Sequence, residues 1–175
     1  MLNFREATVE DALTIANLHA KSWRRTYRGN FQDVFLDDDV FADRKIVWEQ
    51  RLNKPVNNQV VYIAESDGDL CGFICAYCNH DSVWGSFIDN LHVALDLQNQ
   101  GIGAKLMACM GERLSTLVPM CGVHLNVWES NPALYFYERL GGRNSGLVEK
   151  DNPGGGFGRY ILISWEKPEL LINEN

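Results

Sequence analysis

The chain has short runs of alternating or continuous apolar residues, which predict strands, and longer stretches with apolar residues at helical spacing. Strands are expected at 2–7, 59–66, 70–79, 84–93, 122–128, 143–149 and 159–166. Helices are expected after Thr8 and at 38–52, 103–117 and 132–140, with 23–36 irregular or helical. This order predicts a single α/β domain over residues 1–175.

Capping and turn residues support these boundaries. Thr8 with Asp11 three residues later is typical of a helix start. The run Asp67-Gly68-Asp69 between two strand patterns favours a hairpin turn. The glycine-rich run 151–156 predicts a flexible connection between the last two strands.

Composition narrows the class of protein. The chain is 46% hydrophobic and 22% charged, which is ordinary for a globular domain. Its net charge of -7 argues against nucleic acid as the main partner. No apolar run reaches the about 20 residues of a membrane span, and the first residues do not resemble a signal peptide. We therefore expect a cytoplasmic protein that does not bind membranes.

The five cysteines are expected to be reduced thiols, because their number is odd and no secretory signal is seen. Cys75 and Cys78 have C-x-x-C spacing, but they lie on a predicted strand, where their side chains point to opposite faces. Buried structural cysteines are the favoured interpretation, with metal or redox use as the alternative. No metal site is predicted.

A glycine-rich run, Gln98-Asn99-Gln100-Gly101-Ile102-Gly103, joins an expected strand to an expected helix. Its glycines let the backbone approach a bulky anion, and the helix start leaves N–H groups unpaired. No acidic residue lies between Asp96 and Glu112, and Lys105 adds a positive charge. The run predicts a phosphate site, although a tight turn before a helix gives the same letters.

The run matches Gln/Arg-x-x-Gly-x-Gly/Ala, the pyrophosphate loop of the GNAT superfamily of N-acetyltransferases, which use acetyl-coenzyme A. A second block, from Asn131 to Gly142, resembles the superfamily's Asn-x-x-Ala-x-x-Phe-Tyr-x-x-x-Gly-Phe segment, with one residue fewer after the Asn. The resemblance implies the GNAT fold. This α/β fold has a mixed, mostly antiparallel sheet with a splay between the fourth and fifth strands, flanked by helices.

The resemblance also implies where acetyl-coenzyme A binds. Its pantetheine arm would lie between the splayed strands and pair with backbone groups as an added strand does. The predicted cofactor-binding residues are Leu91, His92, Val93, Gln98, Asn99, Gln100, Gly101, Ile102, Gly103, Ala104, Asn131 and Tyr137. Two positions depart from the family pattern: Gln98 replaces a more frequent Arg, and Gly142 replaces a Phe that would anchor the helix.

The implied reaction is direct attack of an amine on the thioester, with no acyl-enzyme. Tyr137 occupies the family's Tyr position and is the predicted catalytic residue, an acid for the departing thiolate. The alternative is that it is a core aromatic. Tyr135 and Phe136 are expected to pack in the core.

The base is not identified from the sequence. Asn90 and Asn126 occupy the positions where many relatives carry a carboxylate, and Asp89 is expected to face away from Asn90. Water is therefore expected to take the amine proton, with His92 as a second candidate. His124, like His92, is more often a packed strand histidine.

The acceptor is expected to be a small-molecule or peptide amine. Trp23, Tyr27 and Gly29 resemble the Trp-x-x-x-Tyr-x-Gly stretch of a GNAT branch that includes polyamine acetyltransferases. Trp23 and Tyr27 share a helix face, so they line the acceptor pocket or pack on the sheet. The acidic loop with Asp33, Asp37, Asp38 and Asp39 selects a cation or is simply solvated.

The predicted function is an N-acetyltransferase acting on a small primary amine such as a polyamine, with a homodimer left open. Two alternatives stand beside it. One is an acetyl-coenzyme A sensor with little transferase activity, which fits the missing base. The other is a nucleotide-binding α/β protein, which lacks an acidic ribose-binding or magnesium motif here.

Overall fold

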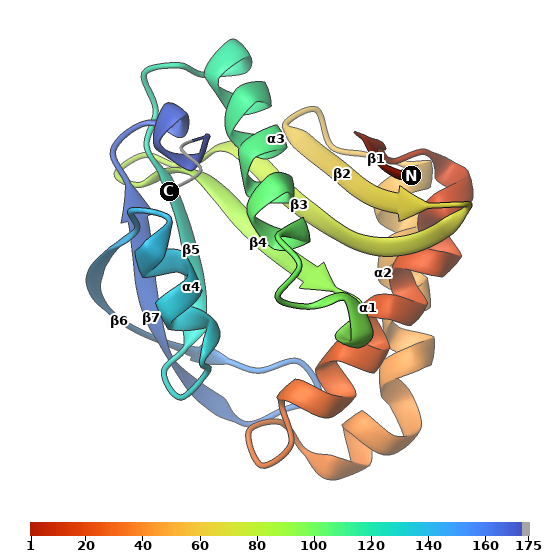
Figure 1. Ribbon diagram of the computed structural model, residues 1–175. Coiled ribbons are helices and arrows are strands. Elements are labelled where there is room, and N and C mark those ends of the chain that lie inside the picture. Colours follow the sequence, from red (N-terminus) through yellow and green to blue (C-terminus); the bar gives the residue numbers. More distant parts are fainter. Residues whose placement is uncertain (173–175) are drawn as a thin grey trace.

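One seven-stranded sheet, in the order β1-β2-β3-β4-β5-β7-β6, runs through the computed structural model, which describes residues 1–172 (Figure 1). The strands are β1 (Leu2–Glu6), β2 (Gln59–Ser66), β3 (Asp69–Asp81), β4 (Gly85–Val93), β5 (Val123–Trp128), β6 (Arg143–Asp151) and β7 (Phe157–Trp165). Neighbouring strands are antiparallel, except that β4 and β5 are parallel. The predicted mixed, mostly antiparallel sheet is confirmed.

Helices cover both faces of the sheet. They are α1 (Ala12–Thr26), α2 (Val40–Asn53), α3 (Ile102–Leu117) and α4 (Ala133–Arg139). Helices α1 and α2 pack on one face, through a core shared with β2 and β3, and α3 and α4 pack on the other (Figure 1). None of the helices in residues 1–172 is long and apolar enough to cross a membrane.

The parallel pair β4 and β5 separates soon after it forms. Only Ser86 with Val123 and Phe87 with His124 are paired across it. Beyond Phe87, β4 remains paired with β3 on its other side, up to Val93. The splay predicted between the fourth and fifth strands is therefore present, and it leaves one backbone edge of β4 without a strand neighbour.

A β-bulge at Asp89 interrupts the alternation of side chains along β4. Cys75 of β3 is opposite Asn90, and the next residue, Ala76, is opposite Ile88, so Asp89 is the extra residue. Arg51 of α2 lies 2.8 Å from Asp89 Oδ2 and also donates to Asn90 Oδ1 at 2.8 Å. The expectation that Asp89 faces away from Asn90 is wrong, because the bulge resets the alternation.

The cysteines occupy the positions expected of structural thiols. Cys75 lies in the core beneath α1 and α2, and Cys78 lies in the core beneath α3, so the two face opposite sides of the sheet. Burial raises the pKa of the Cys75 thiol to about 12, so it stays protonated and unreactive. Residues 1–172 contain no cluster of three or more potential metal ligands.

The connection between β6 and β7, predicted to be flexible, is anchored at Asn152, while its three glycines are exposed. Asn152 is only 6% exposed, and its Oδ1 accepts a hydrogen bond from Tyr160 at 2.6 Å. Its backbone N–H donates to Gly156 at 2.9 Å, and Gly154 lies against the ring of Phe35. In Figure 1 this connection lies beside the chain that follows α1. The glycines allow positive φ angles in a close-packed turn.

Candidate active site

The connection from β4 to α3 has the backbone of an anion-binding loop. Gly101 adopts a left-handed conformation, with φ of 83°, and immediately precedes α3. The first backbone bond of the helix runs from the N–H of Lys105 to the carbonyl of Gly101, at 3.0 Å. The N–H groups of residues 102–104 therefore precede that bond, and no acidic residue lies in the first turn. This helix start is suited to a phosphate.

Two glutamines predicted to bind the cofactor also have hydrogen-bond partners inside the loop. The side-chain amide of Gln98 donates to the Val93 carbonyl at 3.3 Å, and that of Gln100 donates to the Asp96 carbonyl at 3.2 Å. Both side chains therefore hold the loop in shape. Contacts to a phosphate would come from the backbone and from the exposed Lys105.

Helix α4 presents Tyr137 at the splay. Asn131 caps the helix, because its Oδ1 accepts a hydrogen bond from the N–H of Ala133 at 2.9 Å. Tyr137 is 9% exposed and packs edge-on against Trp165, with ring centroids 6.4 Å apart. Burial raises the pKa of the Tyr137 phenol, so it keeps its proton at neutral pH. No hydrogen-bond partner for this hydroxyl is found within residues 1–172.

The glycine at position 142 has a packing reason. A Cβ there would lie 2.5 Å from Ile163 and 2.8 Å from Trp165. The indole N–H of Trp165 donates to the Leu140 carbonyl at 2.9 Å and so holds the end of α4. Trp165 of β7 thus anchors the end of α4, in place of the Phe that the family pattern has at position 142.

The two motifs meet at the start of α3. Phe136 of α4 packs against the core, and its ring lies 3.4 Å from where a Cβ on Gly103 would be. Tyr135 is 71% exposed, so the expectation that it packs is wrong. The Phe136 ring therefore links α4 to the start of α3, and Leu91 and Val93 of β4 pack against the same core as Tyr137.

Comparison with known proteins agrees with this arrangement. A family model described as an acetyltransferase (GNAT) domain matches residues 57–141, which include the loop motif, the splayed strands and all but the last residue of the second block. The chain belongs to the GNAT superfamily. Acyl transfer, the reaction class of the superfamily, is therefore its enzyme class.

Individual proteins are similar to this chain in sequence or in structure. An uncharacterized N-acetyltransferase of Bacillus subtilis, YuaI, is 26% identical over 79% of this chain and 78% of its own length. The PaiA N-acetyltransferase of Thermoplasma acidophilum, solved with coenzyme A, has a TM-score of 0.68, 16% identity, and 95% and 99% of the two chains covered. YncA, a putative acetyltransferase of Salmonella typhimurium solved with acetyl-coenzyme A, has a TM-score of 0.69, 14% identity, and 100% and 96% covered.

Aromatic side chains gather on the α1 side of the GNAT sheet, near the end of β5. Tyr27 stacks on Phe31, with ring centroids 4.5 Å apart, and lies 6.4 Å from Trp128. Trp128 in turn packs edge-on against Tyr160 at 4.9 Å. Trp23 is buried in the core, whereas Tyr27 is partly exposed. Trp23 therefore packs the helix, and Tyr27 belongs to an aromatic wall made of Tyr27, Phe31, Trp128 and Tyr160.

The two histidines considered as bases are poor proton acceptors. His92 Nδ1 lies 2.8 Å from the hydroxyl of Ser22, and burial lowers the pKa of His92 to about 3. His124 is 6% exposed and packs against Phe87, with ring centroids 5.1 Å apart. Burial lowers the pKa of His124 as well. Both rings are therefore uncharged at neutral pH.

Asp89 is a carboxylate that sequence reasoning excluded from the site. The bulge places it on the same side of β4 as Asn90, where Arg51 holds it in an ion pair. Bulges depend on the register of two strands, so no local sequence signal marks this one.

The acidic loop predicted to select a cation or to be solvated is bound by an arginine of the chain. Arg28 forms hydrogen bonds with both Asp33 and Asp37, which leaves neither carboxylate free to select a cation.

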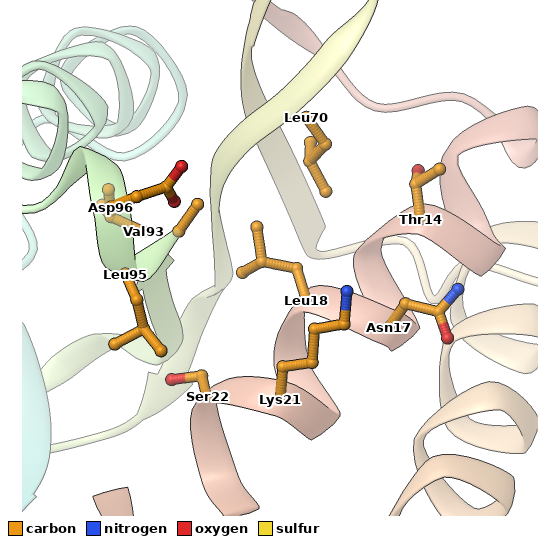
Figure 2. A pocket seen from close by; sticks show the side chains of 10 residues that line it. Thr14, Asn17, Leu18, Lys21, Ser22, Leu70, Val93, Leu95 and Asp96 are labelled. Atoms are coloured by element: carbon orange, nitrogen blue, oxygen red, sulfur yellow. The ribbon is translucent and has the colours of Figure 1, made fainter. Parts of the chain in front are cut away.

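A pocket of about 400 Å³ lies between α1 and the end of β4 (Figure 2). Helix α1 contributes Thr14, Asn17, Lys21 and Ser22, and residues 93–96 form the opposite wall. Of the predicted cofactor-binding residues, Val93 is the one that this pocket includes. Lys21, which the sequence did not single out, adds an ammonium group to this pocket (Figure 2).

Proposed function

We propose that this chain transfers an acetyl group from acetyl-coenzyme A directly to the primary amine of a small molecule. The observation that carries the proposal is the splay between β4 and β5. Its free β4 edge continues into the loop before α3, where N–H groups are open, and Tyr137 of α4 packs in the same core as Leu91 and Val93 of β4. Membership of the GNAT superfamily and the relatives solved with coenzyme A or acetyl-coenzyme A support this donor.

The residues present fit such a donor. The backbone of Leu91–Val93 is free on the β5 side to pair with amide groups, and the N–H groups of 102–104 suit a pyrophosphate. Gln98, Asn99, Gln100 and Gly101 shape the loop, and Asn131 positions α4. When bound, the donor supplies an acetyl group already activated as a thioester.

Residues of the chain and water in the cleft would then carry out the proton transfers that the reaction requires. The N–C bond forms as the C–S bond breaks, and the acceptor nitrogen loses two protons, one before attack and one after it. Tyr137 Oη carries a proton that the departing sulfur can take, and one proton per turnover leaves to solvent. Because His92 is a weak base and Asp89 is paired with Arg51, we assign the first deprotonation to water in the cleft.

A small acceptor suits the aromatic wall. Tyr27, Phe31, Trp128 and Tyr160 offer apolar surface, and the packed β6–β7 connection closes that end of the site. Polyamines belong to the set to be tested, as do amino acids, aminoglycosides and peptide N-termini. The cytoplasmic location and the homodimer stay predictions.

Turnover with that panel tests the proposal. We expect coenzyme A release, with an acetylated amine identified by mass spectrometry. The alternative is a sensor, in which acetyl-coenzyme A binds tightly and no amine is acetylated. Competition between coenzyme A and ATP for the protein separates both from a nucleotide-binding protein, because only that last function predicts that ATP displaces coenzyme A.

A further inference from the structure

Lys150 of β6 faces the same side of the sheet as the aromatic wall. Across the β6–β7 pair, Val148 is opposite Tyr160 and Lys150 is opposite Gly158, so these side chains share one face. Tyr160 is also opposite Trp128 of β5. The Lys150 ammonium lies over the Tyr160 ring, 4.4 Å from its centroid. The long side chain therefore runs from the edge strand back toward the wall.

The Lys150 ammonium is partly buried where it lies over the Tyr160 ring, at the edge of the aromatic wall. Burial lowers the pKa of Lys150, and the negative charge of Asp89 raises it. Within residues 1–172, no carboxylate lies within ion-pair distance of the ammonium.

The charges around the cleft leave this ammonium unmatched. Asp89 forms an ion pair with Arg51 at 2.8 Å, and Asp43 forms one with Arg44. The acidic residues nearest to Lys150 along the chain do not compensate, since Glu149 pairs with Arg159 at 3.8 Å and Asp151 is exposed. A partly buried cation that lies over an aromatic ring and has no anionic partner keeps its three N–H donors available to an anionic group of a ligand.

We propose that Lys150 binds an anionic group of the acceptor, so that the substrate is an amine that also carries a carboxylate or phosphate. An amino acid has this chemistry. A polyamine would instead place a second cation beside an unmatched one, which is unfavourable. This inference rests on the proposed function and narrows its substrate class.

The experiment uses matched acceptors and matched variants of the full chain. The acceptors are an α-amino acid and an ω-amino acid with their amides, ethanolamine phosphate with ethanolamine, and spermidine. The variants are Lys150→Gln, which removes the charge, and Lys150→Arg, which keeps it. Lys167→Gln, at an exposed lysine, is the control. Turnover is measured, and calorimetry measures binding of the same amines to the coenzyme A-loaded protein.

We expect the acids to be bound and acetylated in preference to their amides. Lys150→Gln should raise KM and Kd for the acids by about ten- to a hundredfold, leave the amides and kcat nearly unchanged, and be rescued by Lys150→Arg. The ethanolamine pair separates phosphate from carboxylate recognition.

Two outcomes would overturn the inference. One is preference for spermidine or for the amides, and the other is an equal effect of Lys150→Gln on every acceptor. Binding of an acid that depends on Lys150 without any turnover would instead sink the proposed function and leave the inference standing.

Discussion

Tyr137 is the proposed catalytic acid. Replacing it with Phe keeps the ring that packs against Trp165 and removes only the phenolic proton. We expect Tyr137→Phe to lower kcat by about ten- to a thousandfold, as for a lost general acid, with little change in Kd for acetyl-coenzyme A. Stopped-flow turnover and calorimetry measure the two quantities. Weaker binding with normal turnover would make Tyr137 a positioning residue, and no change in either would make it a core aromatic.

Gly103 tests the phosphate loop at a single residue. A Cβ there would lie 3.4 Å from Phe136, so the neighbouring ring needs to give only slightly and substitution should leave the fold intact. We expect Gly103→Asp to weaken coenzyme A binding at least about a hundredfold, because it adds a negative charge beside the open N–H groups of α3. Gly103→Ala is the control and should cost far less. Unchanged affinity in a folded Asp variant would exclude this loop as the phosphate site.

At the scale of the element, α3 offers its backbone rather than a cluster of cations. With Gln98 and Gln100 bonded inside the loop and Lys105 exposed, we expect coenzyme A affinity to fall less than about tenfold from low to physiological ionic strength. Calorimetry over a salt series measures this. A steep loss would mean that further cations take part. Lys21 in the pocket beside α1 would then be the first to mutate.

At the scale of the whole molecule, Arg5 ties β1 to the start of α1 and to β2. It bonds Asp11 at 2.8 Å and Glu65 at 2.9 Å, while Asp11 also accepts from the Thr8 N–H at 2.7 Å, as the predicted capping pair requires. We expect Asp11→Ala to lower the free energy of unfolding at pH 7 by about 1–2 kcal/mol. Urea denaturation of the two proteins measures the difference.

The same network makes a prediction about pH. The hydrogen bonds from Arg5 lower the pKa of Asp11 below its ordinary value of 3.8. A carboxyl with a lowered pKa in the folded state stabilises it above the ordinary value, and this stability is lost as pH falls through the lowered value. The difference in unfolding free energy between the wild type and Asp11→Ala should therefore be full at pH 7 and shrink below about pH 4. An undiminished difference at pH 2 would contradict the ionic origin of the effect.

The amino-acid sequence by itself determined the order of helices and strands, the anion loop, the capping of α1 and α4, and the superfamily. These features depend on local periodicity, on capping residues and on glycine conformation, all of which are encoded within a few neighbouring positions. Only the tertiary structure decided the features that join distant segments. The bulge that turns Asp89 toward Arg51 depends on the register between β3 and β4.

The packing of the β6–β7 connection depends on Tyr160 and Phe35, and the space above Gly142 is filled by Ile163 and Trp165. The position of the Lys150 ammonium over the Tyr160 ring follows only from the pairing of β6 with β7. Such contacts were beyond the sequence because alternation fixes which side chains share a face of one strand. It does not say which distant residue occupies the space they face.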